Sequence, residues 1–233
     1  MQQLEFLPVL PRVRRVYDVL LVAWLVTVLL MTITHNLFFW YFSSSMANAG
    51  YDYDYEFFDV LVKVVSVIFF LLYLLSSILL LLVEWRVASE FRSHGLTLPF
   101  VGFVLLMVTV FLSVVIELVF FLANMHVLPS SVYDTMSYVT LGSHVLYVLV
   151  LIFAGSVVAL NGFGQLRTAG VLLLLSLVFF VMDIVFYSTI GKEIFAAGSY
   201  GLYYMVAPVL FTIRYVLIFM GLNKIIVAQK LEA

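Results

Sequence analysis

Ionisable side chains occur inside long apolar stretches of this sequence, where a charge is costly to hold. Residues of this kind in membrane-spanning helices usually face the bundle interior or a water-filled cavity, and Asp, Glu and His carry protons in pumps and transporters. Their types and positions therefore predict a site for a proton, an ion or a substrate. The candidate residues are Glu117, Asp183, Arg214, His144 and His35.

These candidates fall at similar depths within their apolar stretches. At a rise of 1.5 Å per residue, all of them lie roughly 10–18 Å from the same membrane surface. Because they come from separate helices, we expect one shared polar layer. Two carboxylates beside one guanidinium leave a negative charge, which a proton, a cation or His144 could balance. In this interpretation Arg214 tunes the carboxylates or binds an anionic group, and Pro208 is a hinge that lets its helix bend.

A purely structural role for the charged residues is the alternative. Arg214 would then neutralise Glu117, Asp183 or both, because a buried charge needs a partner. Such a network fixes the register of the helices and has no further activity. In a third arrangement the charged groups lie on different helix faces and never meet.

The two histidines allow one cofactor hypothesis. A haem takes axial His ligands, so His35 and His144 could clamp one between their helices. A hydrogen-bonded histidine at a helix interface is the more common situation. We therefore expect no cofactor and keep haem as an alternative. With no cysteine in the chain, a thiolate metal site is excluded, and no metal ligands are assigned.

The composition requires a lipid bilayer around these residues. Of the 233 residues, 65% are hydrophobic and only 10% are charged. Soluble domains carry about 25% charged residues, so the excess apolar surface needs lipid to solvate it. The formal net charge of −2 gives no reason to expect a nucleic acid partner.

The elements that position the candidate residues are six apolar segments, each close to the roughly 20 residues that a spanning helix needs. Strands of a membrane barrel would be about half as long and would alternate in polarity. The connections are short, so we expect an all-α integral membrane protein, with residues 1–233 forming one compact bundle. The predicted helices cover approximately 16–42, 58–83, 98–125, 136–160, 169–191 and 202–226.

Lysine and arginine placement predicts the orientation, since loops rich in these residues stay in the cytoplasm. Most of them fall on one side of the six segments, which places both termini in the cytoplasm. Lys192 and Lys63 fall on the opposite side. The residues on the cytoplasmic side are Arg12, Arg14, Arg15, Arg86, Arg92, Arg167, Lys224 and Lys230.

The function classes follow from this architecture and from missing motifs. The sequence has no P-loop, no GxGxxG turn, no HExxH and no GxSxG, so an enzyme is not expected. The first hypothesis is a small transporter or channel-like protein that uses the polar layer. The alternatives are a non-catalytic subunit of a larger membrane complex and, less favoured, a receptor. The small-residue patch Ala154-Gly155-Ser156 should admit a closely packed helix, from this chain or from a second copy in a homo-oligomer.

Overall fold

The computed structural model describes residues 11–49, 55–125, 127–129, 131–186 and 200–228. Within these residues it contains helices and no strands. Six of the helices are long and apolar enough to cross a membrane, so the chain is an integral, multi-pass membrane protein. Their bounds are α1 Pro11–Ala49, α2 Tyr55–Ser93, α3 Thr97–Asn124, α4 Val132–Asn161, α5 Gly164–Val185 and α7 Tyr200–Ala228.

Several helices are longer than the sequence predicts. The helix expected over 58–83 continues to Ser93, because an apolar face with Val87 and Phe91 stays buried beyond Val83. Arg86 and Arg92 therefore lie in α2 and not in a connection. In the same way α5 begins at Gly164, five residues before the predicted start. The predicted end of that helix, 187–191, lies outside the described residues.

The end of α2 shows why the chain turns where it does. Gly95 has a φ of 71°, a left-handed conformation that favours glycine. The N–H of Leu96 donates to the carbonyl of Phe91 at 2.8 Å, and the N–H of Gly95 donates to that of Arg92 at 3.0 Å. These bonds satisfy carbonyls that the end of a helix would leave open. The chain reverses here and enters α3 at once.

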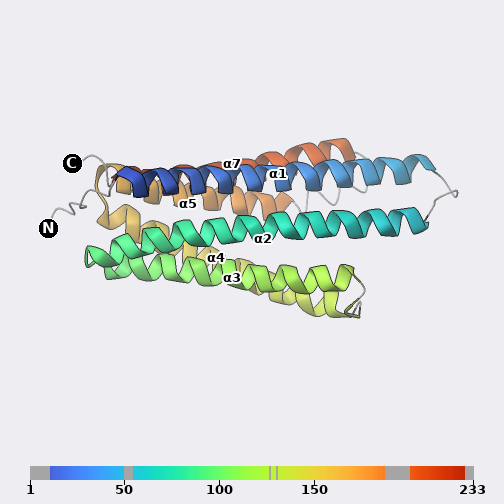
Figure 1. Cartoon of the computed structure of the whole chain (residues 1–233), viewed down its shortest axis with the longest axis horizontal. Coiled ribbons are helices and arrows are strands. Elements are labelled where there is room, and N and C mark those ends of the chain that lie inside the picture. The colour runs from blue at the N-terminus through green and yellow to red at the C-terminus, as the bar shows by residue number, and fades with distance from the viewer. Residues whose placement is uncertain (1–10, 50–54, 126, 130, 187–199, 229–233) are drawn as a thin grey trace.

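The helices form a closed ring in chain order. Each one packs against its neighbours in sequence, and α7 closes the ring by packing against both α5 and α1. Pro11 at the start of α1 and Ala228 at the end of α7 lie at the same end of the bundle (Figure 1). We call this the terminal end and the opposite one the distal end. At the distal end α1 and α2 project beyond the other helices (Figure 1).

The terminal half of the ring is filled by a continuous apolar core. All six helices contribute side chains that are nearly inaccessible to solvent, so this half is closed. The outward faces of the helices carry exposed Val, Leu, Ile and Phe, which suits contact with lipid. The largest fully buried core side chains are Trp24, Phe91, Phe103, Leu21, Leu151, Leu173, Leu222 and Ile225.

Small residues let α4 approach both of its neighbours. A Cβ added to Gly102 of α3 would meet the Cα of Ala154 at 3.0 Å. A Cβ added to Gly170 of α5 would lie 2.3 Å from the backbone nitrogen of Ala159 and 2.6 Å from the carbonyl oxygen of Gly155. The small-residue patch of α4 is therefore occupied by helices of this same chain.

Candidate functional site

A cavity of about 620 Å³ lies inside the ring, and all six helices line it. It borders the apolar core, whose Trp24, Phe103 and Leu173 line its terminal part, and extends from there toward the distal end. Glu117 and Asn36 in its wall are partly accessible, whereas Trp24 and Leu173 near the terminal end are buried. Its volume is in the range of small-molecule sites, about 300–1,000 Å³.

All five ionisable residues singled out in the sequence line this one cavity. Glu117 comes from α3, Asp183 from α5 and Arg214 from α7. The remaining two are His35 of α1 and His144 of α4. The candidates therefore share a single space, and the arrangement in which they lie on unrelated faces is not observed.

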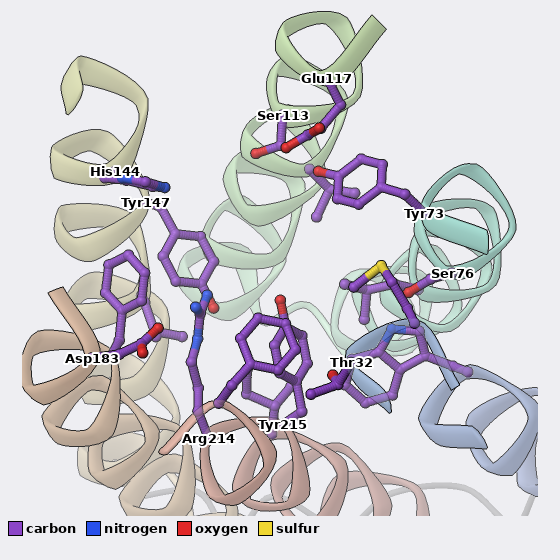
Figure 2. A pocket seen from close by; sticks show the side chains of 18 of the residues that line it. Thr32, Tyr73, Ser76, Ser113, Glu117, His144, Tyr147, Asp183, Arg214 and Tyr215 are labelled. Atoms are coloured by element: carbon purple, nitrogen blue, oxygen red, sulfur yellow. The ribbon is translucent and has the colours of Figure 1, made fainter. Parts of the chain in front are cut away.

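Arg214 is held by aromatic rings. Its guanidinium carbon lies 4.1 Å from the ring centre of Phe180, 5.0 Å from that of Tyr215 and 5.1 Å from that of Tyr147. Cations near ring faces are attracted by the ring quadrupole, more strongly when water is absent. Figure 2 shows Arg214 reaching into the cavity toward Tyr147, with Asp183 beside it.

Glu117 lies across the cavity from this group. Figure 2 shows it with Ser113 and Tyr73, away from Asp183 and Arg214. Within the described residues, no ion pair joins Arg214 to either carboxylate, whereas Lys63 pairs with Asp59 and Arg86 pairs with Glu90. Among the described residues Arg214 therefore has no acidic side chain within ion-pair distance, although Asp183 lies beside it (Figure 2).

Several polar atoms in the cavity wall have no hydrogen-bond partner among the described protein residues. They include the Oδ1 atom of Asp183, the Nε atom of Arg214 and the Oγ1 atom of Thr140, each of them inaccessible to solvent. Asp183 as a whole is only 8% exposed. Buried polar groups are almost always hydrogen-bonded, so each exception needs an explanation. Water or a ligand in the cavity would supply the missing partners.

The two histidines approach the cavity from helices that are not neighbours in the ring. His35 packs against Phe69, with ring centres 5.1 Å apart, and His144 packs edge-on against Phe180 at 5.5 Å. Haem ligation by this pair remains a hypothesis. Among the residues described, no three His, Cys, Asp or Glu side chains are grouped as a metal site would require.

The sequence interpretation missed Glu84, which also lines the cavity. The sequence predicts that the second span ends at Val83, which places Glu84 in a polar connection. The structure continues α2 and buries Glu84 to 5% exposure, with its Oε2 atom lacking any partner. The apolar face through Val83 and Val87 was the available signal, since its helical spacing runs straight past Glu84.

Pro208 lies in the cavity wall, and α7 continues through it. Proline has no N–H, so the carbonyl four residues earlier loses its helical partner at this point. The break occurs less than two turns before Arg214. Pro208 therefore removes one backbone hydrogen bond from the helix that carries Arg214.

Comparison of the chain with protein-family models, with curated proteins and with solved structures found no match. Any function must therefore be argued from the cavity itself.

Proposed function

We propose that this protein is a small transporter whose translocation site is the central cavity, with Asp183 and Glu117 coupling substrate movement to a proton or ion. The observation that carries the proposal is the buried, unpartnered Oδ1 atom of Asp183 beside the unpartnered Nε atom of Arg214. A purely structural network would satisfy its own members, because a half-satisfied one is costly in low dielectric. Here the partners are supplied by the solute and its coupling ion.

The proposed orientation of the protein in the membrane follows from the positive-inside rule. The terminal end, with Arg86 and Arg92 in the last turns of α2 and Arg167 in the first turn of α5, faces the cytoplasm. The cavity is then closed on the cytoplasmic side by the apolar core and approached from outside. Transport requires the core to open, and the break at Pro208 gives α7 a place to bend.

The first test neutralises Asp183 with little change in size. Purified protein is reconstituted into vesicles that contain a trapped pH-sensitive dye, and a potassium gradient with valinomycin drives proton entry. Amines, carboxylates and amino acids are added one at a time. We expect proton flux in the native protein and a loss of about 10- to 100-fold in Asp183→Asn, the range for a lost charged hydrogen bond.

The matched control is Asp59→Asn, a change at an exposed acid of α2 outside the cavity. It should leave flux unchanged. Asp183→Asn should also elute as a monodisperse particle, since the cavity tolerates an amide where a carboxylate stood. Native flux in both Asp183→Asn and Glu117→Gln would refute the transport assignment.

A second test uses the absence of cysteine from the chain. Ser113→Cys places a single thiol in the half-buried wall of the cavity, and Ser176→Cys places one at a position with 0% exposure. In intact cells a membrane-impermeant maleimide should label Ser113→Cys from outside and should not label Ser176→Cys. Labelling of Ser113→Cys only from the cytoplasmic side would reverse the proposed orientation.

The native particle separates this proposal from the accessory-subunit alternative. A transporter of this kind needs only its own ring of helices, so the tagged protein should leave the membrane in mild detergent as one copy or a homo-oligomer. Stoichiometric co-purification with other subunits would instead support a role in a larger complex.

A further inference from the structure

Glu84 forms a second acidic position in the cavity, separate from the layer that contains Asp183. Along α2 it lies about three helical turns beyond Tyr73, roughly 16 Å closer to the terminal end. Tyr73 lies beside Glu117 (Figure 2), so Glu84 is nearer the terminal end of the cavity than the carboxyl group of Glu117. Glu84 and Glu117 therefore line different parts of the cavity.

No cation of the described residues pairs with Glu84. The nearest one in sequence, Arg86, forms an ion pair with Glu90 and lies over the ring of Tyr17 at 5.3 Å. Residues two apart on a helix do not face each other, so Arg86 points away from Glu84. The carboxyl group of Glu84 is 5% exposed and its Oε2 atom has no partner. It needs a positive charge or a proton from outside the chain.

The surroundings of Glu84 are apolar and aromatic. On each helix, the lining residues nearest the terminal end have hydrocarbon or aromatic side chains, with Glu84 as the exception. Trp24, at 0% exposure, packs against Tyr215 with ring centres 5.8 Å apart. Tryptophan is the best aromatic partner for a cation. The apolar lining residues at this end are Trp24, Leu80, Phe103, Leu106, Leu151, Leu173, Ile218 and Leu222.

The carboxyl group of Glu84 and its apolar surroundings determine which class of positively charged ligand fits the cavity. Calcium and magnesium ions take six or more ligands and zinc takes four, and no group of three His, Cys, Asp or Glu side chains that could hold a metal ion occurs in the described residues. A proton would neutralise the carboxylate but would make no contact with the apolar part of the cavity wall. An organic amine satisfies both parts of the site, because its ammonium group pairs with the carboxylate and its apolar body fills the cavity.

We infer that the cavity binds a lipophilic organic amine, with its ammonium group on Glu84 and its apolar body against the aromatic wall that includes Trp24. The inference rests on the proposed function because it names the class of molecule that the same cavity binds. Binding of the amine does not itself require transport. The positive charge of Arg214 does not exclude an ammonium group from the cavity, because the two carboxyl groups of Glu117 and Asp183 line the distal part of the same cavity.

The probe is 2-phenylethylamine, and 2-phenylethanol is its neutral counterpart of similar shape. Each is titrated calorimetrically into the purified, detergent-solubilised full chain at pH 7, with empty micelles as the reference. The amine should bind to the native protein at least about 10-fold more tightly than the alcohol. Glu84→Gln should weaken the amine by about 10- to 100-fold and leave the alcohol unchanged, as expected for loss of a charged hydrogen bond.

Asp59→Asn is the control, since Asp59 is an exposed acid on the same helix that lies outside the cavity. It should bind the amine like the native protein. Equal binding of amine and alcohol to the native protein would overturn the inference without reference to any variant, as would amine binding that survives Glu84→Gln. Amine binding in a protein that shows no proton flux would refute the transport proposal and leave this inference standing.

Discussion

Replacing Gly170 with leucine is expected to abolish the native packing of α4 against α5. A Cβ at this position would lie 2.3 Å from a backbone nitrogen and 2.6 Å from a backbone oxygen of α4, so the two helix backbones must separate. Overpacking of a core usually costs about 1–3 kcal/mol, and backbone clashes exceed that range. We expect the midpoint of thermal unfolding to fall by at least about 6–12 °C, at 2–4 °C per kcal/mol for a chain of this size.

Gly142→Leu is the control for this substitution. Gly142 is an exposed helical glycine of α4, and a Cβ added there would meet nothing within 4 Å. Leucine also favours the helix more than glycine does, so the melting temperature should stay the same or rise. Size-exclusion chromatography and a thermal melt in detergent measure both variants. Equal melting temperatures for Gly170→Leu and Gly142→Leu would show that the close approach of α4 and α5 is wrong.

The transmembrane architecture was predictable because each span must satisfy its own backbone in lipid. Long apolar stretches therefore indicate helices without knowledge of their partners. The ends were less predictable. The sequence predicts that α2 stops at Val83, where charged residues begin, but Trp85 and the buried Val87 and Phe91 continue the helix toward the membrane surface. Charged residues near that surface cost little, so their appearance does not end a helix.

The contents of the cavity were partly predictable for the same reason. A charge such as Asp183 or Arg214 in mid-membrane must face inward, and the structure places both in the cavity wall. The pairing of these charges could not be read from the sequence, because it depends on which helices become neighbours. Glu117 belongs to α3 and Arg214 to α7, which lie on different sides of the ring. Separation along the chain carries no information on that distance.

Replacing Arg214 with methionine is expected to separate function from stability. Methionine keeps an unbranched apolar stem against Phe180, Tyr147 and Tyr215. It removes a cation that has no acidic partner within ion-pair distance among the described residues. A buried charge without an ion-pair partner carries a desolvation cost that an apolar side chain does not. The melting temperature should therefore match or exceed that of the native protein, while flux in the vesicle assay should fall by about 10- to 100-fold.

Two further variants test whether the effect depends on the position and the guanidinium group of Arg214. Arg167→Met removes an exposed arginine of α5 outside the cavity and should leave both flux and melting temperature unchanged. Arg214→Lys keeps the charge but replaces a planar guanidinium with a compact ammonium that cannot stack in the same way, so it should not restore native flux. If Arg214 only neutralised the carboxylates, its loss would leave an uncompensated buried charge at a cost of about 3–5 kcal/mol. A sharply lowered melting temperature with native flux per folded molecule would then be observed, and Arg214 would be a structural cation.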